Sequence, residues 1–132
     1  MDTATRALVR ARAGHRCEYC LIRQEHTETP HHVEHITARQ HRGSDDPSNL
    51  ALACIHCNCH KGPNLTGIDP ETGALVPLFN PRREVWAEHF TLRGAAIVGL
   101  TATGRTTVAV LALNAGHRRN VRAELIAQGL FP

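Results

Sequence analysis

The sequence lacks several features that would each place it in a particular class of protein. It has no run of about 18 consecutive apolar residues, the minimum for a transmembrane helix. Its N-terminus, MDTATRALVRARAGHRC, has no continuous apolar core of the kind found in signal peptides. It also contains no internal repeat and no long low-complexity segment that would indicate disorder. We therefore expect a folded chain that does not associate with membranes and that stays in the cytoplasm.

The chain is short, and its length limits how it can be stabilised. Its 132 residues suit one domain, or a small core with an appendage. The apolar fraction of 42% is ordinary for a globular protein, but so few residues bury only a limited core. A structural metal ion would therefore help this chain to fold.

The chain also has almost no lysine. Fourteen of its fifteen basic residues are arginine, although the formal net charge is only +3. Arginine presents a planar group that grips phosphate at two points, so this bias is compatible with a nucleic-acid partner. The bias by itself is unspecific, because it also follows from genome composition.

The five cysteines are the first strong signal. Four of them form two Cys-x-x-Cys pairs, Cys17 with Cys20 and Cys54 with Cys57, which are separated by 33 residues. Each two-residue spacer lets one turn offer two thiolates to the same ion, and two such pairs complete a tetrahedral zinc site. Since a reducing compartment disfavours disulfides, we predict one structural zinc ion held by these four thiolates.

Other interpretations of the cysteines remain. The pairs could be buried without a metal, or could hold another metal such as iron in the same cage. A redox role is disfavoured, because no βαβ pattern accompanies either Cys-x-x-Cys. Cys59 is left over and is expected to be an ordinary helix residue.

Hydrophobic patterns and turn residues predict an α+β chain in its first half. A helix over 3–13 is capped by Asp2 or Thr3 and stopped by Gly14. HHVEHI (31–36) and LALAC (50–54) are expected to form short strands, joined by the polar loop TARQHRGSDDPSN. A short helix should follow Cys54 and end near KGP.

The second half is expected to be mainly β. DPETG (69–73) lies between two apolar segments and predicts a hairpin with its glycine in the left-handed conformation. AAIVGL (95–100) and TTVAVLAL (106–113) are expected to form a second hairpin around TATGR. A last helix is expected to open at Asn114, to bury Val121 and Leu125, and to end at Gly129.

The segment between and around the cysteine pairs carries a second pattern. It contains an acidic residue followed by histidine, Glu34-His35, then RGSDDPSNL with Asn49 14 positions after His35, then CIHCN with Asn58 9 positions after Asn49. In these elements the sequence resembles the HNH endonuclease family, in the form that has zinc knuckles and asparagine in place of the last histidine. The tail, with LFNPRREVWAEHF and GLTATGRTTV, resembles an extension found in a subset of bacterial members.

This resemblance implies a fold and a set of roles. The family fold is a ββα-metal (His-Me finger) core, here stapled by the four-cysteine zinc site and followed by a mainly β extension and a C-terminal helix. We expect the core to span residues 1–64 and the extension 65–132. By resemblance, His35 is the general base, Glu34 and Asn58 are ligands of a catalytic magnesium or other divalent cation, and Asn49 holds the loop and keeps His35 in place.

The residue types suit that chemistry. Phosphodiester hydrolysis needs an activated water and neutralisation of the charge that grows on the phosphate. A histidine titrates near neutral pH, and a hard cation prefers oxygen ligands such as a carboxylate and an amide. The sequence departs from the usual pattern in having glutamate rather than aspartate before the histidine. Because neighbouring strand residues point to opposite faces, Glu34 and His35 can share one site only if the strand ends there.

Some assignments stay open at this point. His60 is an alternative to Asn58 as ligand if the helix register differs from the expected one. Arg39, Arg42 and Lys61 are candidates for nucleic-acid contact. The expected function is metal-dependent endonucleolytic cleavage of nucleic acid, with double-stranded DNA as the favoured substrate. The alternatives are a zinc module that binds nucleic acid without cutting it, and a nuclease that acts mainly on RNA.

Overall fold

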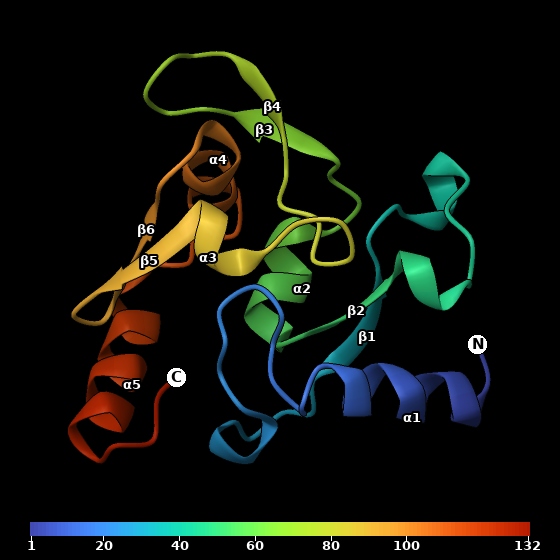
Figure 1. Ribbon diagram of the computed structural model, residues 1–132, viewed down its shortest axis with the longest axis horizontal. Coiled ribbons are helices and arrows are strands. Elements are labelled where there is room, and N and C mark those ends of the chain that lie inside the picture. Colours follow the sequence, from blue (N-terminus) through green and yellow to red (C-terminus); the bar gives the residue numbers. More distant parts are fainter.

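The computed structural model describes residues 1–132, and its first half follows the expected order of elements (Figure 1). Helix α1 (Thr3–Arg12) is followed by strand β1 (His32–His35), strand β2 (Leu50–Ala53) and helix α2 (Ile55–Lys61). Three short 3-10 turns, η1 (Gln24–His26), η2 (Arg39–His41) and η3 (Pro47–Asn49), lie in the connections. Asp2 caps α1 by accepting a hydrogen bond from the Thr5 amide at 2.7 Å.

Strands β1 and β2 form an antiparallel pair, and α2 begins directly after it. In the register of this pair, Glu34 lies opposite Ala51 and His35 lies opposite Leu50. All four residues of β2 are buried, so β2 is the interior strand of the pair. The strand, strand and helix therefore occur in the expected order. Whether they hold a catalytic ion is a separate question, which depends on the side chains described below.

The second half is not mainly β, which corrects the expectation from the sequence. It contains strands β3 (Thr66–Ile68), β4 (Leu75–Pro77), β5 (Phe90–Arg93) and β6 (Ala96–Gly99). Apart from the expected C-terminal helix α5 (Gly116–Ala127), it contains helices α3 (Trp86–His89) and α4 (Ala102–Val110), which together hold nearly as many residues as the strands. The first expected hairpin is confirmed, because β3 pairs with β4 and Gly73 has a positive φ of 76°.

The second expected hairpin was wrong in its partner strand. β6 pairs with β5, which precedes it, and residues 102–110 form α4 instead of a strand. Thr101 caps this helix by accepting a hydrogen bond from the Gly104 amide at 3.0 Å. A Cβ atom on Gly104 would come within 2.0 Å of the His89 carbonyl oxygen, so the helix lies directly on neighbouring backbone. Tertiary packing thus overrides the β propensity of TTVAV.

Both halves contribute to one hydrophobic cluster. Among its 14 buried residues are Tyr19 and Ala51 from the first half, and Phe79, Phe90 and Ile97 from the second. Trp86 packs against this cluster, and its indole nitrogen donates to the Tyr19 carbonyl at 2.9 Å. This tryptophan therefore joins the second half of the chain to the first. None of the helices is long and apolar enough to span a membrane.

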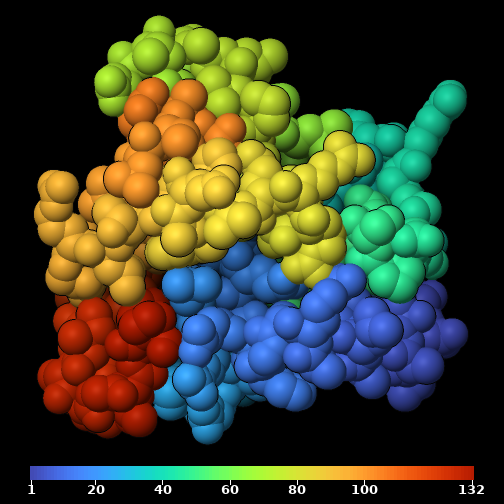
Figure 2. Space-filling model, viewed as in Figure 1, coloured from blue at the N-terminus to red at the C-terminus, as the bar shows by residue number.

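Helix α5 has an unexpected buried face. Val121 is 44% exposed and Leu125 is only partly buried, whereas Arg118 and Arg122 are 5% and 2% exposed. The helix begins after Ala115, close to the expected start at Asn114. In Figure 2 the C-terminal residues, in red, lie against the light-blue segment of the first half.

Candidate active site and metal centre

The four paired cysteines come together in the interior. Cys17, Cys20, Cys54 and Cys57 are all buried, and their sulfur atoms lie within 4.8 Å of one another. Cys59 is exposed and takes no part in the cluster. Four convergent thiols without a disulfide are the donor set of a structural zinc site.

The backbone around each pair has the shape that a metal-bound knuckle requires. The Cys20 amide donates to the Cys17 sulfur at 3.5 Å, and the Cys57 amide donates to the Cys54 sulfur at the same distance. Cys54 is also the N-cap residue of α2, so one sulfur both caps the helix and faces the cluster. These contacts stabilise thiolates, and the residues therefore fit a zinc ion.

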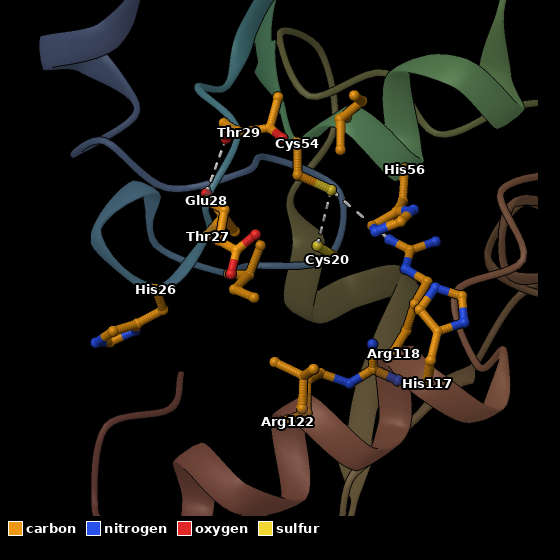
Figure 3. A pocket seen from close by; sticks show the side chains of 13 residues that line it. Cys20, His26, Thr27, Glu28, Thr29, Cys54, His56, His117, Arg118 and Arg122 are labelled. Carbon is orange, nitrogen blue, oxygen red and sulfur yellow. Dashed lines mark hydrogen bonds between the residues drawn. The ribbon is translucent and has the colours of Figure 1, made fainter.

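Arg118 completes the cluster from the other half of the chain. Its guanidinium group donates to the Cys57 sulfur at 2.9 Å. It also donates to the Cys54 sulfur at 3.8 Å, the contact that Figure 3 draws. The same group donates to the Leu111 carbonyl at 2.7 Å. Although burial lowers the pKa of Arg118, the neighbouring thiolates outweigh this effect and raise it above its ordinary value. Four thiolates around one zinc ion would leave a net negative charge, which the arginine is placed to offset.

A cavity of about 380 Å³ adjoins this centre, and Figure 3 shows its lining. Cys20 and Cys54 form one wall, while Arg118 and Arg122 reach in from α5. Arg122 is fixed by donating to the Ala95 carbonyl at 2.8 Å and to the Asn114 side chain at 3.0 Å. Both arginines are committed to contacts within the protein. The sequence pattern did not reveal Arg118, because it lies 64 and 61 residues from the two cysteines that it contacts.

A second site lies at the end of β1. Glu34, His35 and Asn58 line one open hollow of about 460 Å³, which is also bordered by Arg39 and Gly62. β1 ends at His35, so the alternation of side chains between the two faces of the strand stops there. Glu34 and His35 can therefore both face the hollow. The structure therefore brings together the three side chains that the family resemblance links to catalysis.

Glu34 is the most enclosed of the three. It is 6% exposed; one carboxylate oxygen accepts from the Tyr19 hydroxyl and the other lies 3.3 Å from the Lys61 ammonium nitrogen. Burial raises the pKa of the Glu34 carboxyl, and the Lys61 charge and the Tyr19 hydrogen bond oppose that rise. A carboxylate has about four lone-pair sites, so these two contacts leave room for a cation. Asn58 and Glu34 thus offer oxygen ligands, but a cation would have to compete with Lys61 for Glu34.

His35 is held by a residue that the sequence did not single out. Its Nε2 atom lies 2.7 Å from Asp45 Oδ1, and Arg39 donates to both oxygens of Asp45 at 2.8 Å. The hydrogen bond from His35, together with the charge of Arg39, lowers the pKa of the Asp45 carboxyl to about 2. Asp45 lies in the expected loop beside Asp46, and sequence alone does not separate the two.

Asn49 fixes the loop that carries Asp45. Its side-chain oxygen accepts from the Thr37 amide at 2.9 Å, and its amide nitrogen donates to the carbonyls of Thr37 and Ser44 at 3.0 and 2.9 Å. The loop is tight, because a Cβ atom on Gly43 would lie 1.6 Å from the Thr37 carbonyl oxygen. Asn49 thus holds the loop as expected, while the hydrogen bond to His35 comes from Asp45 instead.

The remaining candidate residues differ in where they lie relative to the hollow. Lys61 is 2% exposed and donates to the Ile36 carbonyl at 3.0 Å, so the expectation that it contacts nucleic acid is corrected. The His60 side chain is exposed and its ring nitrogen lies 2.8 Å from the His56 carbonyl, whereas Asn58 lines the hollow. Arg39 borders the hollow, and Arg42 is exposed three residues further along the same loop.

Comparison with known families identifies one part of the chain. Residues 17–64 match the family model of the HNH endonucleases. The matched segment contains both cysteine pairs, β1, β2 and α2, and the cysteine cluster fits a zinc-knuckle variant of this domain. The chain matches no curated protein and no solved structure.

Proposed function

We propose that this HNH domain hydrolyses phosphodiester bonds in DNA, with His35 as the general base and a divalent cation as cofactor. The observation that carries the proposal is the hollow at the end of β1, where His35, Glu34 and Asn58 meet. Such a meeting of a base with two oxygen ligands is needed for hydrolysis, whereas a purely structural zinc module has no use for it.

The side chains divide the work as follows. His35, whose side chain is 20% exposed, takes a proton from a water molecule in the hollow. Glu34 and Asn58 would hold a cation such as Mg²⁺, which neutralises charge on the phosphate when it is bound. Asn49 keeps the loop over 37–44 in place, so that the groups around His35 have a fixed geometry. Catalysis therefore depends on positions set by β1, the loop and α2.

The substrate proposal rests on the arginines around the hollow. Arg39 borders the hollow and Arg42 is exposed on the same loop. Guanidinium groups bind backbone phosphates without reading sequence. Double-stranded DNA is the substrate that we propose, with little sequence preference in the initial binding step.

One observation favours a second candidate function. The Lys61 ammonium lies 3.3 Å from Glu34 in the interior. It therefore already pairs with the carboxylate that a cation would need as a ligand. A zinc module that binds nucleic acid without cutting it would keep this ion pair permanently. The two functions differ in whether a divalent cation supports turnover.

The test is cleavage of supercoiled plasmid by the zinc-loaded protein, with and without Mg²⁺ or Mn²⁺. His35→Ala should retain zinc, fold and DNA binding, but lose about 10²- to 10⁴-fold in rate, the usual value of a positioned base. His32→Ala is the matched control, since His32 is an exposed histidine on the same strand and does not line the hollow. Cleavage by His35→Ala at the wild-type rate would refute the role of His35. DNA binding without metal-dependent cleavage by the wild type would support the second candidate.

A further inference from the structure

Asp45 stands out among the residues around His35, because nothing in the family pattern assigns a role to this carboxylate. It lies 10 residues from His35 along the chain and is brought back to it by the folded loop. Arg39 donates hydrogen bonds to both oxygens of Asp45, and the His35 ring is hydrogen-bonded to one of them. The neighbouring Asp46 caps η3 instead, accepting from the Ser48 amide at 2.9 Å and from the Ser48 hydroxyl at 2.7 Å.

The contact determines which ring nitrogen of His35 carries the proton. An ionised carboxylate has no hydrogen to donate, so in the 2.7 Å contact Nε2 must be the donor. In the neutral ring the other nitrogen, Nδ1, is then unprotonated. Nδ1 makes no hydrogen bond within the protein. It is also not one of the buried polar atoms that lack a partner. It is therefore the atom that is free to accept a proton from water.

Arg39 makes the carboxylate a dependable acceptor. Its two 2.8 Å hydrogen bonds fix the orientation of Asp45, and its positive charge favours the ionised form. Asn49 and the close approach at Gly43 fix the loop on which Asp45 stands. Arg39 thus fixes the carboxylate, and the rigid loop fixes the backbone of Asp45, so the contact with the His35 ring has a defined geometry.

We propose that Asp45 is a positioning residue that holds His35 as the Nε2–H tautomer and aims Nδ1 into the hollow as the atom that accepts the proton. Arg39 acts through Asp45 by holding the carboxylate. This inference rests on the proposed function of His35 as base, but the tautomer can be measured without any cleavage assay.

The test uses three variants of the full chain in its zinc-loaded form: Asp45→Ala, Asp45→Asn and the matched control Asp46→Ala. Nitrogen-15 NMR of the histidine rings, at a pH where the rings are neutral, separates protonated from unprotonated nitrogens. The His35 signals are assigned by their loss in His35→Ala. The wild type and Asp46→Ala should show one protonated and one bare nitrogen for His35, with the proton on Nε2. Asp45→Ala should move both signals toward the average of the two tautomers.

Plasmid cleavage supplies the second readout. Asp45→Ala should lower kcat by about ten- to a hundredfold with KM nearly unchanged, which is the scale of one charge-assisted hydrogen bond. Asp45→Asn keeps one oxygen that can accept from Nε2 and should recover part of the loss, while Asp46→Ala should cleave at the wild-type rate. A proton on Nδ1 in the wild type, or an unchanged tautomer in both Asp45 variants, would overturn the inference. Inactive His35→Ala beside fully active Asp45→Ala would overturn it while leaving the proposed function intact, and active His35→Ala would remove the proposed function itself.

Discussion

The two candidate metal centres of residues 17–64, the segment that matches the HNH family model, differ in almost every physical respect. The cysteine centre is closed: its four sulfurs are buried, and Arg118 from α5 covers it. The hollow at the end of β1 is open, with His35 20% exposed and Arg39 67% exposed at its edge. Helix α2 links them, because Cys54 begins it and Asn58 lies one turn further along.

The closed centre is suited to stabilising the fold, and the open site is suited to catalysis. A closed tetrahedral set of thiolates leaves no coordination position for a substrate, so its free energy of binding serves folding. An open site with oxygen ligands and a partly exposed histidine has room for water and phosphate. We therefore expect changes at the cysteine centre to affect folding first, and changes in the hollow to affect turnover while the fold persists.

The largest expected effect tests the closed centre. Cys54→Ser removes one thiolate but leaves a hydroxyl that can still cap α2, so the protein should lose its zinc ion and much of its stability through the metal centre alone. Structural zinc contributes on the order of 10 kcal/mol or more to such folds. Zinc content by atomic emission and the melting temperature are the measurements. Cys59→Ser is the control, since Cys59 is exposed, and an unchanged zinc content in Cys54→Ser would contradict the four-thiolate site.

The features that could be predicted from sequence are those set by local spacing. The two Cys-x-x-Cys pairs, the helix capped by Asp2 and the hairpin turn that ends in Gly73 each depend on a few neighbouring residues. The same holds for the order of β1, β2 and α2. Such patterns have one dominant structural solution, and the structure shows it.

The features that could not be predicted depend on contacts between distant segments. Residues 106–110 are rich in β-branched side chains, yet they form the end of α4, which packs on distant backbone. A Cβ atom on Gly104 would lie 2.0 Å from the His89 carbonyl oxygen, and the Thr107 hydroxyl accepts from the Phe79 amide at 2.9 Å. The buried face of α5 was assigned to apolar residues, but the thiolates favour Arg118 there. Asp45 could not be distinguished from Asp46 before the loop was folded.

A second prediction tests whether Glu34 belongs to the open site or to the interior. Glu34→Gln keeps an acceptor for Tyr19 but removes the negative charge that faces Lys61. If Glu34 is a cation ligand, cleavage at low Mg²⁺ should fall by about 10- to 100-fold and should partly recover at high Mg²⁺. Zinc content should stay the same, which separates this effect from loss of the cysteine centre.

The control for this experiment is Glu28→Gln, an exposed carboxylate outside the hollow. The metal titration of cleavage should be the same for this variant and the wild type. A Glu34→Gln protein whose activity does not respond to added Mg²⁺ would show that the carboxylate acts through its pairing with Lys61 alone.

A third prediction sharpens the boundary between the two halves of the chain. Arg118→Met removes the donor to Cys57 and Cys54 while keeping a long side chain in the buried position. Loss of such a partner typically weakens metal binding by about 10- to 100-fold, so zinc should pass faster to a chromogenic chelator. Arg119→Met, an exposed neighbour on α5, should release zinc at the wild-type rate. Equal release from both variants would mean that the extension does not stabilise the zinc centre.

The smallest expected effect concerns the rim of the open site. Arg42 is exposed on the loop beside the hollow, and its backbone is fixed in the left-handed region with φ of 67°. If this side chain neutralises one phosphate, Arg42→Ala should reduce the slope of log affinity against log salt by about 0.9. Binding of uncut duplex DNA, measured by fluorescence anisotropy without divalent cations over several salt concentrations, gives that slope.

The control for this last measurement lies on the other half of the molecule. Arg93 is exposed at the end of β5, which Figure 1 places far from the loop between β1 and β2. Arg93→Ala changes the net charge by the same amount, so it corrects for long-range electrostatics. If DNA lies across the hollow, only Arg42→Ala should lose a full phosphate contact, and both variants should retain the wild-type melting temperature. Equal slopes for the two variants would place the DNA elsewhere, and the open site would then lack the substrate that its chemistry requires.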